Sequence, residues 1–260
     1  MDWEKMLYPD EEKPLDRLVQ GYSNTSIFRT MAFVGDSLSS GEFETRDKDG
    51  NPGWHDLYEY SWGQYIARNN GLKAYNFSRG GMTAAEYLDS FAEANGFWDP
   101  EKACQAYVIA LGVNDVINNS MPVGGMEDVD VADYTKNNPE TFLGRYAAIV
   151  SRYKEISPDA KFFFVTFPKE CPEHAQVQNV IRGLYDLAER FENAYVIDLY
   201  QYGPVYDDRF REQYYLYDHM NPSGYILTAQ LVDSYIDYIV RHNPKDFDTV
   251  GFIGTDIPYK

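Results

Sequence analysis

The 260-residue sequence contains only two cysteines, Cys104 and Cys171, which lie far apart and show no CxxC spacing. A disulfide scaffold or a thiolate metal site needs more thiols at closer spacing, so we expect neither, and the pair suits buried thiols in a reducing compartment. No apolar run approaches the ~18 residues of a membrane-spanning helix. The acid-rich N-terminus also lacks the pattern of a secretion signal. The sequence therefore predicts a cytoplasmic protein without a membrane span.

Positive charge and histidine are scarce as well. The 23 Lys and Arg residues stand against 41 Asp and Glu, which gives a formal net charge of −18. Such a surface repels polyanions and disfavours nucleic acid and anionic membranes as partners. The three histidines other than His219 have no metal-ligand spacing. The DKDGN segment at 47–51 is similar to a calcium loop but has Pro52 where Gly is needed and Tyr58 where Glu is needed. We therefore expect no metal and no cofactor.

What the sequence does contain is a regular alternation of two hydrophobic patterns. Short apolar runs rich in β-branched and aromatic residues predict strands at 27–35, 73–78, 106–112, 161–167 and 194–200. Amphipathic stretches predict helices at 56–70, 83–95, 141–156, 177–191 and 224–242. Runs that are apolar throughout are typical of strands covered on both faces. The alternation therefore predicts an α/β fold with one parallel sheet and helices on both sides.

Several segments fall outside this alternation. The predicted domain covers residues 27–243, with an N-terminal arm at 1–26 and a C-terminal tail at 244–260, both expected to wrap the domain or a partner. Two long polar loops, 41–54 and 116–140, interrupt the domain. Long loops inside a compact domain are often functional, so we consider loop 41–54 as one wall of a pocket. A solvated excursion remains the alternative.

Polar residues follow the predicted strands where each one ends. In an open parallel sheet, ligands bind at the carboxyl ends of the strands. Ser37 follows the first strand, Gly81 the second and Asn114 the third, and His219 precedes the last helix. Taken singly, each position has an ordinary explanation as a turn, a helix cap or a surface histidine. Together they supply a hydroxyl, a flexible backbone donor, an amide and an imidazole, which are the parts of acyl transfer.

The same positions resemble the four sequence blocks of the SGNH (GDSL) hydrolases, the GDSL-like lipase/acylhydrolase family. The blocks are GDSL at 35–38, N-x-x-x-x-G at 76–81, G-x-N-D at 112–115 and His219 before Asn-Pro. The resemblance spans roughly residues 30–240. It implies a flavodoxin-like three-layer αβα sandwich with a five-stranded parallel sheet in the order 2-1-3-4-5.

The resemblance also implies roles for individual residues. Ser37 is the expected nucleophile, which leaves Ser39 and Ser40 as turn or pocket-wall residues. His219 is the expected general base. The expected oxyanion hole consists of the Ser37 and Gly81 N–H groups and the Asn114 side-chain amide. Gly81 is preferred to the glycine before it because Gly-Met-Thr at 81–83 aligns with the family's Gly-Asp-Thr, from which it departs by one residue.

One departure from the family pattern concerns the acid that orients the histidine. The family places Asp three residues before the catalytic His, and that position is Leu216 here. We therefore predict a Ser–His dyad in which the carbonyl of Leu216, or one beside it, accepts the Nδ1–H of His219. The rival hypothesis is a carboxylate, either Asp218 or a distant acid such as Asp115.

These residues predict a serine esterase that acts on a small or medium acyl ester, with acetylated carbohydrate as one option. The alternative is a catalytically impaired SGNH-fold ligand-binding protein, which the missing acid motivates. A phosphate-binding module is disfavoured because no glycine-rich phosphate loop follows the first strand. Phe43, Trp54 and Arg79 are the candidate substrate-binding residues, although Arg79 has an acidic ion-pair partner as its alternative role. The sequence leaves open a homo-oligomer.

Overall fold

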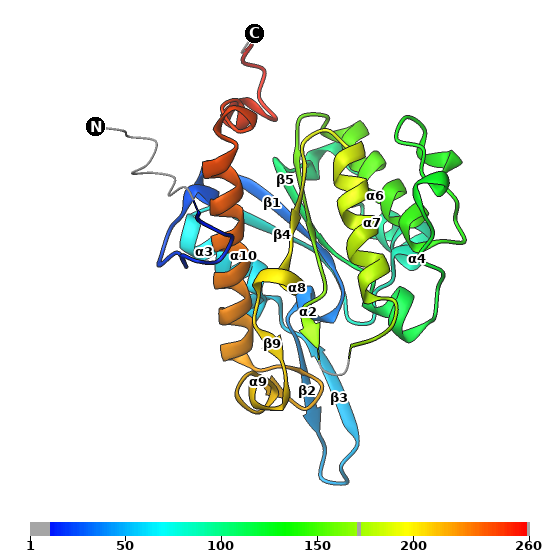
Figure 1. Cartoon of the computed structure of the whole chain (residues 1–260), viewed down its shortest axis with the longest axis vertical. Coiled ribbons are helices and arrows are strands. Elements are labelled where there is room, and N and C mark those ends of the chain that lie inside the picture. The colour runs from blue at the N-terminus through cyan, green and yellow to red at the C-terminus, as the bar shows by residue number, and fades with distance from the viewer. Residues whose placement is uncertain (1–10, 171–172, 259–260) are drawn as a thin grey trace.

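The computed structural model describes residues 11–170 and 173–258, and its centre is a five-stranded parallel sheet (Figure 1). The strand order is β4-β1-β5-β6-β8, which confirms the predicted order 2-1-3-4-5. The strands are β1 Thr30–Gly35, β4 Lys73–Ser78, β5 Ala106–Ala110, β6 Lys161–Val165 and β8 Ala194–Ile197. All five predicted strands are therefore present, each within the predicted range.

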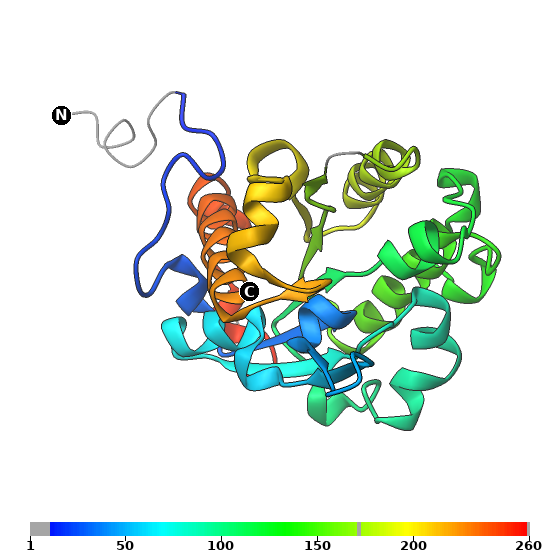
Figure 2. The same ribbon diagram turned by 90° about the horizontal axis from the view of Figure 1, so that it is seen from below.

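Helices cover both faces of this sheet, as Figure 2 shows when the molecule is seen from below. One face carries α3 Trp62–Asn70 and α10 Pro222–His242. The other carries α6 Phe142–Ile156, α7 Val177–Arg190 and a broken helix made of α4 Ala84–Glu86, η3 Tyr87–Phe91 and α5 Ala92–Ala94. The expected three-layer sandwich is thus confirmed. The helix predicted at 56–70 begins only at Trp62, where Ser61 caps it by accepting the Gln64 N–H.

Shorter elements connect the layers. The remaining helices are α2 Ser37–Ser40, α8 Leu199–Tyr202 and α9 Asp208–Tyr214. The remaining strands form three pairs: β2 Glu42–Arg46 with β3 Pro52–Asp56, β7 Lys169–Glu170 with β9 Val205–Tyr206, and β10 Tyr215–Leu216 with β11 His219–Met220. Single turns are η1 Asn24–Ile27, η2 Tyr58–Tyr60, η4 Pro100–Lys102, η5 Val113–Asn118, η6 Met126–Asp128, η7 Tyr134–Lys136, η8 Pro244–Asp246 and η9 Val250–Phe252.

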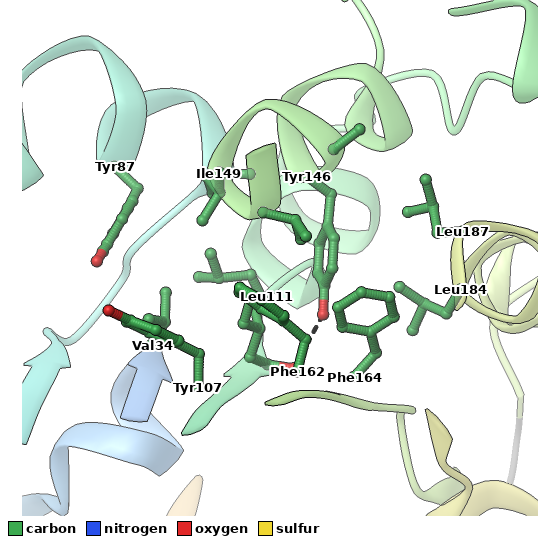
Figure 3. Close-up of a cluster of buried hydrophobic side chains, with 14 of the residues drawn as sticks. Val34, Tyr87, Tyr107, Leu111, Tyr146, Ile149, Phe162, Phe164, Leu184 and Leu187 are labelled. Atoms are coloured by element: carbon green, nitrogen blue, oxygen red, sulfur yellow. Dashed lines mark hydrogen bonds between the residues drawn. The ribbon is translucent and has the colours of Figure 1, made fainter. Parts of the chain in front are cut away.

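The core is aromatic, in keeping with the composition. Tyr107 and Phe162 stack between the sheet and α6 with ring centroids 5.3 Å apart (Figure 3). Tyr146 lies edge-on to Phe164 and donates its hydroxyl to the Ile109 carbonyl at 3.0 Å. A buried tyrosine hydroxyl needs such a partner. This packing fixes β5 and β6, and with them the loops at their carboxyl ends.

Segment 41–54, expected to be a loop, belongs to the β2–β3 hairpin instead. The antiparallel register pairs Glu42 with Asp56 and Arg46 with Pro52. The DKDGN segment at its tip is a turn, because the Asp47 carboxylate accepts the N–H groups of Asp49 and Asn51 at 2.8 and 2.9 Å. Figure 1 shows the hairpin extending beyond the carboxyl ends of the central strands.

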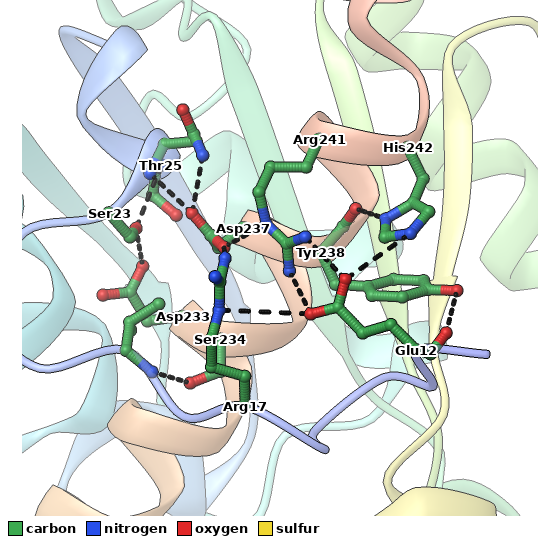
Figure 4. Close-up of polar contacts among 12 residues, drawn as sticks. Glu12, Arg17, Ser23, Thr25, Asp233, Ser234, Asp237, Tyr238, Arg241 and His242 are labelled. Atoms are coloured by element: carbon green, nitrogen blue, oxygen red, sulfur yellow. Dashed lines mark hydrogen bonds and ion pairs between the residues drawn. The ribbon is translucent and has the colours of Figure 1, made fainter. Parts of the chain in front are cut away.

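The N-terminal arm lies along α10 (Figure 4). Glu12 pairs with Arg241 at 2.7 Å, and the Val19 N–H bonds to Ser234 at 2.9 Å. The tail packs at the amino ends of the strands, where Arg29 bonds to the carbonyls of Gly251 and Ile253. Both segments contact the domain itself.

Two further observations bear on the expectations above. Cys104 is buried, and burial raises the pKa of its thiol to about 12, while Cys171 lies outside the described residues. Across residues 11–170 and 173–258, no helix is both long and apolar enough to cross a bilayer.

Candidate active site

A cavity of about 640 Å³ opens at the carboxyl ends of the central strands. Its wall comes from six parts of the chain: the turn after β1, the β2–β3 hairpin, the turn after β4, the turn after β5, the segment after β6, and the α9–β11 region. The lining residues are Asp36, Ser37, Leu38, Glu42, Trp54, Gly80, Gly81, Val113, Asn114, Asn118, Pro168, Glu170, Arg211, Tyr215, Asp218 and His219. The structure therefore brings together Ser37, Gly81, Asn114 and His219, although they are up to 182 positions apart in sequence (219 − 37).

The turn after β1 presents Ser37 to this cavity. Asp36 caps α2 by accepting the Leu38 N–H at 3.2 Å, so that Ser37 is the first residue of the helical turn. A side chain at Gly35 would collide with Ser39 Oγ, which explains the glycine before the cap. Gly41 ends the turn in the left-handed region, with φ of 76°. The polar GDSLSSG sequence thus builds one capped turn with Ser37 at its cavity side.

The two neighbouring serines have other surroundings. Ser40 is fully buried and bonds to the Ser37 carbonyl and to Asp56. Ser39 is 1% exposed, and its hydroxyl has no hydrogen-bond partner among the described residues. Only Ser37 among the three lines the cavity of 640 Å³.

The donors expected for an oxyanion lie on two linked turns. Gly81 adopts φ of 71°, a left-handed conformation that favours glycine. The Asn114 Nδ2 group donates to the Met82 carbonyl at 3.1 Å, which ties the turn after β4 to the turn after β5. Asn118 donates to Asn114 Oδ1 at 2.8 Å and fixes the amide's orientation. One Asn114 N–H remains for a ligand, since its amide nitrogen carries two.

Two buried carboxyl groups support these turns. Burial raises the pKa of Asp36 to about 7, against the opposing effect of the Leu38 N–H. Burial likewise raises the pKa of Asp115 to about 6, although its carboxylate accepts the Ala84 N–H at 2.9 Å. Asp115 thereby holds the start of α4 and makes no hydrogen bond to His219 within the described structure.

His219 lies between two carboxylates of the β2 strand. Its Nδ1 is 3.4 Å from Glu44 Oε2, and its Nε2 is 3.4 Å from Glu42 Oε1. Burial raises the pKa of Glu42, with the charges of Asp56 and Glu44 acting in the same direction and the nearby His219 opposing them. No hydrogen bond joins Ser37 Oγ to His219 among the described residues. The imidazole is therefore in the same cavity as the serine, with acids at both ring nitrogens.

The Ser–His dyad prediction is wrong in its main-chain part. The group that faces His219 Nδ1 is the Glu44 carboxylate, not the Leu216 carbonyl. The Asp218 carboxylate is not the acceptor either, since no hydrogen bond or ion pair joins it to His219 among the described residues; the Asp218 N–H donates to Glu44 Oε2 at 3.0 Å. Leu216 instead pairs with His219 across the short β10–β11 hairpin.

The candidate substrate-binding residues separate in the structure. Trp54 is 57% exposed and lines the cavity. Phe43 points the other way and packs against Tyr60 and Tyr225, with ring centroids 5.7 and 5.5 Å away. Arg79 pairs with the half-buried Glu86 at 2.8 Å and is not part of the cavity wall. Of the three candidates, Trp54 therefore lines the cavity and Phe43 and Arg79 do not, and the ion pair of Arg79 is its alternative role stated above.

Sequence reasoning missed Glu42 and Glu44. Both lie on one face of β2, because alternate residues of a strand point to the same side. The acid–aromatic–acid order at 42–44 was a usable signal, with Phe43 directed to the core and the acids to the opposite face. It was overlooked because the segment was interpreted as a loop. Over the described residues, no group of three or more His, Cys, Asp or Glu side chains has the arrangement of a metal site.

Comparison with solved structures agrees with this architecture. A family two carbohydrate esterase from Clostridium thermocellum, in complex with cellohexaose, aligns at a TM-score of 0.58 and 16% identity over 88% of this chain and 67% of that one. A carbohydrate esterase family 2 enzyme from Corynascus thermopiles, which carries a carbohydrate binding domain, aligns at a TM-score of 0.55 and 15% identity. This alignment covers 86% of this chain and 69% of that one. The acetyl xylan esterase AlAXEase aligns at a TM-score of 0.50 and 17% identity, over 80% of this chain and 99% of that one. At these identities the likeness shows the fold.

Comparison of the sequence with protein families is more specific. No curated protein matches the chain. The model of the GDSL-like Lipase/Acylhydrolase family, however, matches residues 33–227. This range covers three quarters of the chain and includes Ser37, Gly81, Asn114 and His219. The chain therefore belongs to the GDSL-like lipase/acylhydrolase family of hydrolases.

Proposed function

We propose that the protein is a serine esterase that hydrolyses a small or medium acyl ester through an acyl-enzyme. The observation that carries the proposal is the convergence of Ser37, His219, Gly81 and Asn114 on one cavity. Ser37 Oγ attacks the ester carbonyl while His219 takes its proton, and the imidazolium then protonates the leaving alkoxide. The N–H groups of Ser37 and Gly81 and the Asn114 amide donate to the oxyanion. Water, activated by His219, then hydrolyses the acyl-enzyme.

The resting arrangement sets a condition on this mechanism. His219 Nε2 faces Glu42 and is not hydrogen-bonded to Ser37 within the described structure. Catalytic hydrogen bonds are often long without substrate and shorten in the complex. The proposal therefore requires Ser37 Oγ and His219 Nε2 to come within hydrogen-bond distance when an ester fills the cavity.

A second, smaller cavity supports a short acyl group. It measures about 70 Å³ and shares Asp36, Leu38, Val113 and Pro168 with the first, while most of its other lining residues are apolar. An acyl chain entering beside Leu38 would meet this apolar space, whereas the alcohol would remain in the larger, more polar cavity. The difference between 70 and 640 Å³ favours a small acyl group on a larger alcohol.

Acetylated carbohydrate is a substrate class that fits this division. The larger cavity contains Glu42, Glu170 and Asp218, whose carboxylates accept hydrogen bonds from hydroxyl groups. Several structural neighbours are carbohydrate or acetyl xylan esterases, which supports the same class. A cytoplasmic location and a homo-oligomer stay predictions.

Fluorophosphonate labelling tests the proposal, because the reagent reacts only with an activated serine. Wild type should be labelled and should release acetate from acetylated sugars faster than it releases longer acids. Ser37→Ala should abolish both signals, and Ser39→Ala, a change of similar size one position beyond Leu38, should retain both. If wild type is unlabelled and turns over no ester in a panel of chain lengths, the alternative of an impaired ligand-binding protein replaces the esterase. Equal loss in Ser39→Ala would instead mean that the wrong serine has been assigned.

A further inference from the structure

We propose that Glu44, on the β2–β3 hairpin, is the positioning carboxylate of His219. It would replace the acid that the family places three residues before the histidine. The inference rests on the proposed function, in which His219 is the base. It adds a residue 175 positions away from the histidine, supplied by the segment that follows the nucleophile turn.

The first support is the direction of approach. Glu44 Oε2 is 3.4 Å from His219 Nδ1, and Nδ1 is the nitrogen that must be held if Nε2 is to accept the serine proton. Glu44 Oε2 also accepts the N–H of Asp218, the residue directly before the histidine. One carboxylate oxygen thus contacts both the imidazole and the backbone that carries it.

The second support is that Glu44 is itself fixed. The side chain is 2% exposed and pairs through Oε1 with Arg46, which lies on the same face of β2. Burial tends to raise the pKa of Glu44, but the Asp218 N–H, Arg46 and His219 outweigh it and hold the pKa below its ordinary value. A buried carboxylate that stays ionised can stabilise an imidazolium better than a neutral carbonyl can.

The third support is the contact between the two hairpins. The Arg46 guanidinium lies over the ring of Tyr217, 4.4 Å from its centroid. Tyr217 has φ of 59°, an uncommon conformation for a residue with a side chain, and forms the turn between β10 and β11. Glu44 and Arg46 therefore hold consecutive residues of the turn that carries His219. The β2–β3 hairpin therefore restricts the position of His219 through these contacts.

The competing acceptors are accounted for elsewhere in the structure. Asp115 bonds to the Ala84 N–H, and the exposed Asp218 carboxylate makes no hydrogen bond or ion pair with His219 among the described residues. Glu42 lies on the opposite side of the imidazole, at Nε2, and lines the cavity. Glu42 is therefore placed to contact the substrate, and Glu44 is placed to hold the imidazole at Nδ1, the nitrogen directed away from the substrate.

The test compares Glu44→Gln with Glu12→Gln. Glu12 is a matched control: its side chain is 7% exposed, it pairs with Arg241, and its Oε2 is 3.7 Å from His242 Nε2 (Figure 4). Both changes remove one buried, arginine-paired carboxylate next to a histidine. We expect Glu44→Gln to lower kcat by about 10²–10⁴ with little change in KM, since the corresponding change in a serine protease triad costs ~10⁴. Glu12→Gln should lose stability but keep kcat.

A second measurement does not depend on turnover. In wild type with ¹⁵N-labelled imidazole rings, the His219 spectrum should show the proton on Nδ1 in the neutral form, shifted downfield by the carboxylate. Glu44→Gln should move that signal, and Glu12→Gln should not. Unchanged kcat and an unchanged His219 spectrum in Glu44→Gln would overturn the proposal. A wild type without esterase activity but with the Nδ1–H signal would refute the proposed function alone.

Should Glu44→Gln fail to fold, the wild-type spectrum still decides, because a proton on Nε2 in the neutral form contradicts a carboxylate-held Nδ1. Arg46→Met provides a folded comparison, since it removes the guanidinium but leaves the carboxylate facing the ring. We expect it to keep the Nδ1 tautomer and to lower kcat less than Glu44→Gln. A larger loss of kcat in Arg46→Met would overturn the assignment of the effect to Glu44.

Discussion

Replacing Asp36 with Asn should stabilise the protein relative to wild type by an amount that grows as the pH rises. Asp36 is 6% exposed and caps the turn that carries the nucleophile. Its pKa is about 7 in the folded protein and 3.8 in the reference state. Between these values the folded state binds a proton that the unfolded state has released, so wild type loses stability as pH rises. Asn keeps the oxygen that accepts the Leu38 N–H and removes the titration.

The magnitude follows from the width of that pH window. Each unit of pKa difference corresponds to about 1.4 kcal/mol. From pH 5 to pH 8 the folded carboxyl ionises across about two units of the window, so the stability gap between Asp36→Asn and wild type should grow by about 3 kcal/mol. For a chain of this size that is on the order of 5–10 °C in Tm. Any constant effect of the amide cancels in this comparison.

Urea unfolding at pH 5, 6, 7 and 8, followed by tryptophan fluorescence, measures the gap directly. Asp115→Asn serves as the graded comparison, because burial raises the Asp115 pKa only to about 6. Its gap should grow by about half as much over the same range, roughly 1.4 kcal/mol. Parallel stability profiles for wild type and Asp36→Asn would refute the reasoning, since they would mean that Asp36 ionises normally in the folded protein.

Three other predictions concern the cavity and the hairpin beside it. Asn114→Ala should lower kcat by about 10²–10³ with a modest change in KM, because an oxyanion donor acts mainly in the transition state. Steady-state kinetics on an acetyl ester measures both constants. A change in KM alone would make Asn114 a binding residue. Trp54→Ala should change the preference among alcohols of acetyl esters, because its side chain lines the larger cavity. Shortening the hairpin tip at 47–51 should leave that preference unchanged, because the tip is not part of the cavity wall; an altered profile would show that the tip reaches the substrate.

The central sheet could be predicted because each of its strands is buried on both faces. Phe162, Phe163 and Phe164 are successive buried residues of β6, and a run of this kind leaves a clear hydrophobic signal. The convergence of Ser37 and His219 followed from topology, since the carboxyl ends of parallel strands lie at one edge. The same argument brought Gly81 and Asn114 to this edge, whereas the preference for Gly81 over Gly80 and the expected roles of these residues depended on the family resemblance.

The hairpins could not be predicted by that argument. The face of β2 opposite Phe43 carries Glu42 and Glu44, which bury their charge against His219 and Arg46. A search for buried strands looks for apolar residues at alternate positions and therefore passes over such a strand. The β10–β11 hairpin has two residues on each side, too few for any periodic pattern. Glu44, the partner of His219, was missed because it lies on the short β2–β3 hairpin and contacts residues of the β10–β11 hairpin.

The arm along α10 has a consequence for the order in which the protein folds. Glu12 pairs with Arg241, and Ser23 bonds to Asp233, so these contacts join residues 229 and 210 positions apart. During synthesis, the arm leaves the ribosome long before α10 exists to receive it. Contacts of such long range form late, because a long loop must close before they are made. Until residue 241 has emerged, Glu12 lacks its arginine, and the docking of the arm is therefore among the last steps of folding.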